Sequence, residues 1–395
     1  MSLRLIGAAI AALGAAAEAQ TPEAPRLLLD SRLRYEFIDQ DGLPEDAHAA
    51  TLRNRFGLET PAYAGFRLLL ELEHVAAVLE DYNDGVDGDP RRPVVSDPES
   101  FEFNRVQLSW SGAGGRSAVL GRQAIDVGSR RFLATSTWRQ LEQTFDAVRL
   151  GASVGPAKLH YAYVDRVLRA TVRRSPQRAW ESDSHVLWAE AKTPWGALTP
   201  YAVVLDLDED APLQSSATWG ARLSGSRKAA AGELLYAVEY ARQTDHAGNP
   251  RAFGLDYIAV EAGVRRGAAS VTANLERLGG DGRTGLRTPL GSRHSFQGWS
   301  DAITDAPAGG LLDLNIKAVT TWKGAPVGDG LRFEGRAYLF TDEAGDGELG
   351  EEFNASVGTR LNRRVSAELK AAVFNGRVPA YADRTKVWVT TEVKF

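Results

Sequence analysis

One segment of the sequence, Val119–Leu150, carries far more charged and hydrogen-bonding side chains than a connection between two strands needs. It reads as a strand, a long polar excursion and a second strand. The guanidinium group of arginine donates paired hydrogen bonds to a carboxylate, and rings of arginine or lysine give pores a preference for anions. We therefore interpret the segment as the lining of a passage, with Trp138 among its arginines. Its charged and amide side chains are Arg122, Arg130, Arg131 and Arg139 with Gln123, Gln140, Gln143, Asp126, Glu142 and Asp146.

The elements that hold this segment are predicted from a two-residue alternation of apolar and polar side chains. In the last such stretch, Val387, Val389 and Val393 share one face, whereas Lys386 and Glu392 share the other. Several earlier stretches of the chain repeat the pattern. Alternation of this kind indicates half-buried β-strands.

The linkers between these stretches are short and long in turn. Short turns on one side and long loops on the other are typical of a transmembrane antiparallel β-barrel, and the chain has room for about 18 strands. A propeller, β-helix or sandwich would show a fixed repeat or a different burial pattern, and we find no repeat. The predicted short turns are Pro61–Gly65, Ser111–Gly115, Ser153–Pro156, Pro194–Gly196 and Asn362–Arg364. The predicted long loops are Asp81–Ser100, Arg173–Ser184, Asp206–Ser215, Gly279–Gly310 and Asp342–Gly350.

Both ends of the chain fit an outer-membrane protein of a Gram-negative bacterium. Met1–Arg4 is positively charged, Leu5–Ala17 is apolar, and Ala17–Ala19 fits a cleavage site, so residues 1–19 are predicted to be a secretory signal peptide. The apolar stretch is too short for a membrane-spanning helix. At the other end, Phe395 is the terminal aromatic residue that such barrels commonly carry. Residues 20–395 show no linker, so we predict a single barrel domain.

Composition excludes some other classes of protein. The chain has no cysteine, so disulfides do not stabilise it. Its formal net charge of −5 is mild for its length and argues against a nucleic-acid partner.

If the apolar face of the barrel meets lipid, the opposite face meets the lumen. Carboxylates lie on the same face as many arginines, so one interpretation is a paired, solvated wall with little selectivity. The alternative is an excess of arginines at the narrowest level, which would select anions. The selectivity prediction therefore depends on whether the four arginines of Val119–Leu150 are unpaired. The lumen face is predicted to carry Asp30, Arg32, Arg34, Glu36, Arg53, Arg55, Arg105, Arg332, Glu334, Arg336 and Lys370.

The sequence also resembles the alginate export family of outer-membrane porins. The resemblance implies a barrel of about 18 strands that passes an anionic polyuronate through an arginine-rich channel, with Gly121–Phe145 at the constriction. The chain is shorter than the best-known member, so oligosaccharides or uronates are equally compatible, in either direction of transport. The matching residues are Gly121–Gln123, Arg130 and Arg131, Trp138–Gln140 and Thr144–Ala147, then His294–Leu312, with Phe101–Trp110 also similar.

Three functions remain open: a substrate-selective channel for anionic saccharides, a general diffusion porin, and an outer-membrane enzyme or scaffold. We predict the first and expect no enzymatic activity, because the six histidines are scattered and no nucleophile motif is present. The expected partners are the saccharide, outer-membrane lipid and possible periplasmic export or uptake proteins, with the chain a monomer. No cofactor or metal is predicted. Asp81–Asp89 looks like a calcium loop, but Arg92 stands where an EF-hand needs glutamate, so a solvated loop is expected.

Overall fold

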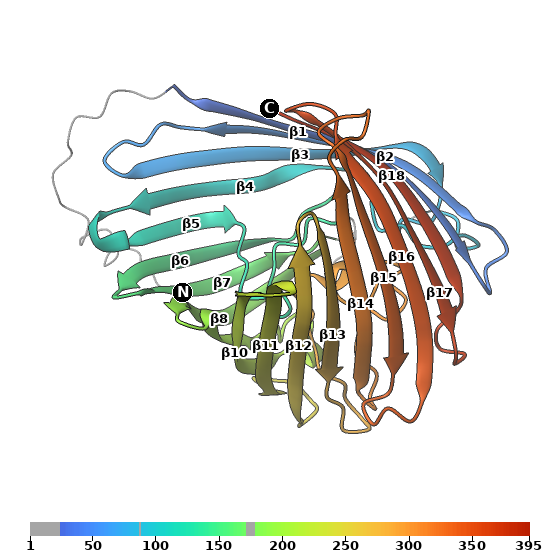
Figure 1. The fold of residues 1–395 in the computed structure, drawn as a ribbon. Helices are drawn as coiled ribbons and strands as arrows, with labels where there is room; N and C mark the ends of the chain where they lie inside the picture. The colour runs from blue at the N-terminus through green and yellow to red at the C-terminus, as the bar shows by residue number, and fades with distance from the viewer. Residues whose placement is uncertain (1–23, 87, 171–177) are drawn as a thin grey trace.

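The structure, a computed structural model, describes residues 24–86, 88–170 and 178–395. These residues form one 18-stranded sheet in which each strand pairs antiparallel with the next. β1 (Arg26–Gln40) pairs with β18 (Arg384–Lys394), so the sheet closes into a barrel and the predicted fold is confirmed (Figure 1). The other strands are β2 (Ala47–Glu59), β3 (Phe66–Asp81), β4 (Ser100–Ser111), β5 (Ser117–Gln123), β6 (Thr144–Val154), β7 (Ala157–Leu168), β8 (Ala179–Thr193), β9 (Gly196–Leu205), β10 (Ser216–Ala229), β11 (Gly232–Asp245), β12 (Gly254–Arg266), β13 (Ala269–Leu278), β14 (Leu311–Trp322), β15 (Leu331–Thr341), β16 (Glu348–Arg360) and β17 (Val365–Gly376).

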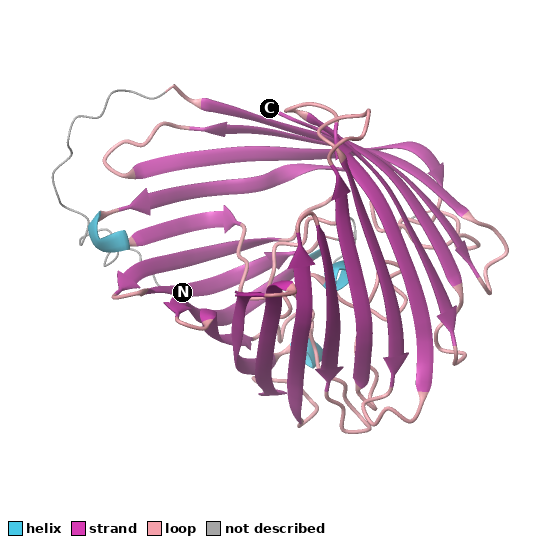
Figure 2. Cartoon of the chain, in the orientation of Figure 1, coloured by secondary structure: helices cyan, strands magenta, loops and turns pink. Residues whose placement is uncertain are grey.

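Short and long connections alternate along the barrel as predicted. The turns after even-numbered strands are short, and at Gly155 between β6 and β7 the backbone has a φ of 56°, which favours glycine in a tight hairpin. Most connections after odd-numbered strands are longer. The predicted signal peptide and part of the predicted loop Arg173–Ser184 lie outside the described residues. The helical segments within the described part of the chain are short turns, and none could cross a membrane (Figure 2).

The two faces of the sheet differ as a barrel in lipid requires. On β14, Ile316 is 57% exposed on the outer face, whereas Asp313 is 1% exposed on the inner face. On β18, Val389 is exposed and Trp388 is buried. A closed barrel pairs every backbone group within the sheet, so it can present this apolar outer face to hydrocarbon.

An arginine in the middle of the outer face is expected to destabilise the barrel. Ile316→Arg places a charge near the bilayer centre and should lower the free energy of unfolding in lipid by roughly 2–4 kcal/mol. Thr320→Arg, on the same face but near the end of β14, should cost about 0–1 kcal/mol because the charge reaches the interface. Denaturant titration in phospholipid vesicles measures both. Equal costs at the two positions would contradict the assignment of this face to lipid.

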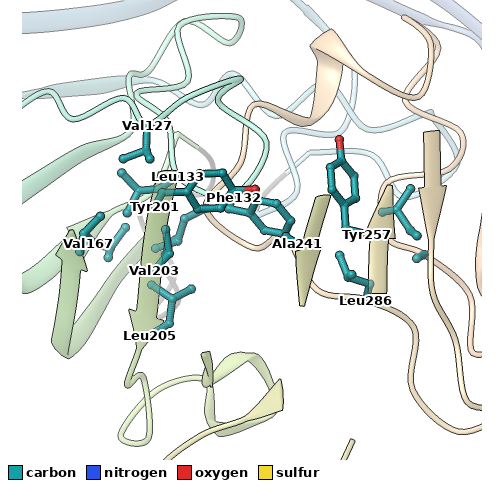
Figure 3. Packing of buried hydrophobic residues seen from close by; sticks show 14 of the residues in the cluster. Val127, Phe132, Leu133, Val167, Tyr201, Val203, Leu205, Ala241, Tyr257 and Leu286 are labelled. Atoms are coloured by element: carbon teal, nitrogen blue, oxygen red, sulfur yellow. The ribbon is translucent and has the colours of Figure 1, made fainter. Parts of the chain in front are cut away.

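A large apolar core lies inside the barrel rather than between two sheets. Val127, Phe132 and Leu133, which follow β5, pack against inward side chains such as Tyr201 and Val203 of β9 (Figure 3). Where the first inner loop packs, the inner faces of β7 to β9 are therefore apolar, as at Ala162, Val186 and Val203. This inward burial explains why alternation in the middle of the sequence is less clear than at its ends.

Candidate functional site

Two connections fold into the lumen instead of extending outside it. We call residues 124–143, between β5 and β6, the first inner loop, and residues 279–310, between β13 and β14, the second inner loop. The first inner loop is held to β13 by Arg131, whose Nε lies 3.0 Å from Glu276 Oε1. It is held to β1 by Arg32, whose Nε donates to Gln140 Oε1 at 2.8 Å. Because β1 and β13 are distant in the ring of strands, this loop crosses the lumen.

The second inner loop lies directly against the first. Leu133 and Leu290 form a parallel bridge, and the Ser292 amide donates to the Arg130 carbonyl at 3.0 Å. The contact requires glycine at position 291, where a Cβ would lie 2.0 Å from the Arg131 carbonyl oxygen. The two loops therefore form one partition inside the barrel.

Hydrogen bonds between carboxylates and donors, formed across the boundary between wall and loops, fix this partition in place. Glu352 of β16 accepts hydrogen bonds from the Trp299 and Ser300 amides and from the Ser300 hydroxyl. In the first inner loop, Glu142 accepts from Asn104 at 2.7 Å and from Arg105 at 2.8 Å. Burial alone would raise the pKa of Glu142, but the neighbouring guanidinium groups, with Arg105 among them, hold that pKa below its usual value.

The centre of the partition is a cluster of rings and cations. Trp138 stacks on His294 with ring centroids 3.6 Å apart and planes inclined by 7°. Trp388 of β18 meets Trp138 edge-on at 5.5 Å. The Lys370 ammonium, from β17, lies 3.9 Å from the centre of the Trp138 ring and 3.8 Å from that of Trp299. Such distances fit cation–π attraction.

Two cavities meet at this cluster. The larger, of about 810 Å³, opens toward the end of the short turns, and Arg32, Arg34 and Lys370 are among its lining residues. The smaller, of about 380 Å³, lies toward the long loops. Trp138 and His294 line both cavities, so the stacked pair is the boundary between them. The arrangement is that of a constriction with a vestibule on each side.

Three cations at the larger cavity have no carboxylate partner within the described part of the chain. Arg34 donates to the Trp138 carbonyl at 2.7 Å, and Arg32 donates to the Thr137 carbonyl at 3.0 Å. Lys370 contacts His294 Nε2 at 2.7 Å. Backbone carbonyls and a ring nitrogen orient these groups without neutralising their charge. An anion in the cavity would therefore meet uncompensated positive charge.

The carboxylate of Asp301 lines the smaller cavity. It lies 3.0 Å from His294 Nδ1, 3.5 Å from an Arg139 nitrogen and 3.6 Å from Lys386 Nζ. Asp301 has a φ of 54°, which costs a non-glycine residue on the order of 1 kcal/mol. Burial would raise the pKa of Asp301, but these three neighbours hold it well below its usual value.

The contribution of Asp301 to the anchoring of the partition is accordingly expected to resist acid. A carboxyl with a lowered pKa stabilises the fold at pH values above its unfolded pKa of about 3.9, and the contribution is lost only as the pH falls through the lowered value. Asp301→Asn removes the charge and should therefore accelerate proteolysis of the second inner loop by a similar factor at pH 7 and at pH 4.5, each rate compared with wild type at the same pH. An effect of the substitution that is present at pH 7 and lost by pH 4.5 would contradict this.

Arg122 and Asp146 do not line the lumen, contrary to our prediction. They share the outer face of β5 and β6 with the exposed Leu120 and Leu150, and they pair with each other at 2.8 Å. The polar excursion begins only after β5, so Arg122 still follows the strand's alternation. The pair lies at the end of these strands nearest the long loops.

The other three arginines of the segment are also ion-paired. Arg130 contacts Asp126 at 3.1 Å, Arg131 is buried against Glu276, and Arg139 lies 3.0 Å from a Glu36 oxygen. Arg130 lines the larger cavity and Arg139 the smaller. None of the four is therefore the unpaired cation on which the selectivity prediction depended.

Some of the remaining predicted residues have structural contacts only, whereas others line the larger cavity. Gln123 and Gln140 are buried; the amide of Gln123 donates to the Ala147 carbonyl and that of Gln140 to Thr51. The other arginines all pair with carboxylates. The members of this group that line the larger cavity are Arg53, Arg55, Arg105 and Arg336, together with Trp138. Arg332 does not line it.

Sequence reasoning placed Arg32, Arg34 and Lys370 on the lumen face but did not select them as site residues. The alternation in β1 and β17 gave their direction; only the structure gives their lack of carboxylate partners. His294 lay within the second motif, at His294–Leu312, but nothing local linked it to Trp138 or Lys370. No three His, Asp or Glu side chains gather in a metal-ligand arrangement within the ranges that the structure describes.

The closed barrel, its apolar exterior and its lumen-crossing loops define the class as an outer-membrane β-barrel. No protein-family model matches the sequence, so the resemblance to the alginate export family stays a prediction. No curated protein matches it either.

Several solved structures of bacterial proteins do match the fold. Acinetobacter baumannii OccAB3 has a TM-score of 0.72 and 14% identity, with 94% of this chain and 99% of that chain covered. Pseudomonas aeruginosa OccK2 (OpdF), solved in complex with glucuronate, has a TM-score of 0.71 and 12% identity, with 94% and 98% covered. Pseudomonas aeruginosa OpdK, solved with vanillate, has a TM-score of 0.70 and 13% identity, with 93% and 98% covered. At these identities the likeness establishes the fold alone: this chain has the closed 18-stranded antiparallel barrel of these outer-membrane structures.

Proposed function

We propose that this chain is an outer-membrane channel that admits small anionic solutes, with carboxylates such as uronates as its substrates. The observation that carries the proposal is the set of three cations, Arg32, Arg34 and Lys370, that line the larger cavity without a carboxylate partner among the described residues. An anion is attracted to such a site more strongly than to a wall of paired charges, because no carboxylate of the described residues lies within ion-pair distance of these three cations.

The size of the lumen favours monomers or short oligomers over long alginate. The two inner loops divide the lumen into cavities of about 810 Å³ and 380 Å³. A long polyuronate would have to thread the ring cluster at Trp138 and His294. The glucuronate named for OccK2 and the vanillate named for OpdK are both single-ring acids, which supports the same size class. We propose a monomeric channel without enzymatic activity, whose partners are the solute and outer-membrane lipid.

Current block in planar bilayers tests this function. Glucuronate and short uronate oligomers, added to a single channel in KCl, should reduce the current at millimolar concentration, whereas glucose at the same concentration should not. Long alginate should block without passing. Equal effects of glucuronate and glucose would contradict the proposal.

A general diffusion porin is the second candidate, because most lumen arginines are ion-paired. In that case neutral and anionic sugars of equal size would permeate at equal rates. Liposome swelling with glucose and with sodium glucuronate distinguishes the two functions, since only the selective channel favours the acid.

A further inference from the structure

The Lys370 ammonium is buried among aromatic rings although it lies on the lumen side of the barrel. It is 6% exposed, on the inner face of β17, and it lines the larger cavity. The faces of Trp138 and Trp299 flank its ammonium at 3.9 Å and 3.8 Å. Its one hydrogen-bond contact is with His294 Nε2, at 2.7 Å. Rings on two sides exclude water from the charge without neutralising it.

His294 connects this lysine to Asp301. Its Nδ1 lies 3.0 Å from Asp301 Oδ1, so the proton of the neutral ring belongs on Nδ1. Nε2 then carries a lone pair, which accepts a hydrogen bond from the Lys370 ammonium. The stack on Trp138 fixes the plane of the ring. Other charged groups close to this hydrogen-bonded series are Arg139 and Lys386, which contact Asp301, and Arg34, which lies over Trp138. The Glu368 carboxylate lines the same cavity as Lys370.

We propose that Lys370 is the specificity-determining cation of the constriction, which takes the carboxylate of a single-ring acid, and that His294 and Asp301 are positioning residues that orient it. This inference rests on the proposed function and assigns its selectivity to one side chain. An ammonium group has three N–H donors, and His294 takes one, so the others remain for the two oxygens of one carboxylate. Chloride cannot accept hydrogen bonds through two separate oxygens, so it gains less from the same site.

The remaining lumen chemistry is consistent with this assignment. Arg32 and Arg34 supply positive charge at the larger cavity, but their donors are engaged by loop carbonyls and neighbouring side chains. They therefore attract anions of any shape. Lys370 stands where the larger cavity reaches Trp138 and His294, and a solute that moves between the cavities passes it.

The first test is Lys370→Met, which removes the charge and retains the length of the side chain between the tryptophans. The dissociation constant for glucuronate block should rise about tenfold or more, as loss of a charge-assisted hydrogen bond implies. Single-channel conductance in KCl should change less than twofold. The matched control is Lys317→Met, which removes a lysine that lines a different cavity of the same barrel. Glucuronate affinity should stay within twofold of wild type in the control. Unchanged affinity in Lys370→Met, or equal loss in the control, would overturn the inference.

The second test separates positioning from packing at His294. His294→Gln retains an oxygen that can accept from Lys370, whereas His294→Leu fills the space without an acceptor. Glucuronate affinity should be nearly restored in the glutamine variant and reduced about tenfold in the leucine variant. Equal losses in both variants would overturn the positioning role.

Failure of this inference differs from failure of the proposed function. If glucuronate blocks wild type and Lys370→Met equally, the channel is selective but Lys370 is not its determinant. If glucuronate blocks neither protein, both proposals are wrong.

Discussion

Replacing Trp138 by alanine is expected to open the constriction and abolish its preference for organic acids. The Trp138 ring lines both cavities and is packed against His294, Trp388 and the cations of Arg34 and Lys370. Its loss joins the two cavities and removes one of the two tryptophan rings that flank Lys370. Conductance in KCl should rise roughly twofold, because the constriction sets the resistance of the pore. Affinity for glucuronate should fall about tenfold, as for the loss of one charge-assisted hydrogen bond.

The control for this experiment is Trp195→Ala. Trp195 is 65% exposed at the turn between β8 and β9, and such positions form the interfacial aromatic belt. Its loss should leave conductance and block unchanged. A Trp138→Ala channel with wild-type conductance would show that the ring cluster is not the narrowest level.

The second large effect is expected from neutralising the two cations of β1 together. Arg32→Gln with Arg34→Gln removes both charges and retains side-chain amides that can donate to the loop carbonyls. At an effective dielectric constant near 20, each charge about 6 Å from a permeating anion contributes roughly 3 kcal/mol before screening by salt, so the anion-to-cation permeability ratio should fall at least about tenfold. The reversal potential in a salt gradient measures this ratio.

Arg122→Ala is the matched control, since Arg122 pairs with Asp146 on the outer face. It removes one arginine of the same barrel without changing the lumen and should leave the reversal potential where it is. If the control shifts the reversal potential as much as the double substitution, long-range net charge and not the lumen cations sets the selectivity.

Much of the fold was predictable because a strand between lipid and lumen alternates apolar and polar side chains. An outer face in hydrocarbon must be apolar, so β14 and β18 alternate clearly and their faces were assigned correctly. This alternation disappears where the inner face is apolar as well. Val186 and Val203 face inward on β8 and β9, but they are buried beneath the first inner loop, so both faces look alike in the sequence.

The candidate site was less predictable because it depends on contacts between distant segments. Lys370 and His294 are separated by 76 positions, and Arg34 meets Trp138 across 104. Local patterns gave the direction of Arg34 and Lys370 but not their partners. The density of arginines in Val119–Leu150 predicted a selective site there, but nearby carboxylates pair with those arginines. The uncompensated cations lie on strands whose sequences look ordinary.

The measurement that tests the central claim most directly is the reversal potential with potassium chloride on one side of the bilayer and potassium glucuronate on the other. If the constriction passes small organic anions through sites such as Lys370, glucuronate should carry current, and the permeability ratio of glucuronate to potassium should exceed one. A glucuronate permeability that cannot be distinguished from zero, with current carried by potassium and chloride alone, would contradict the account.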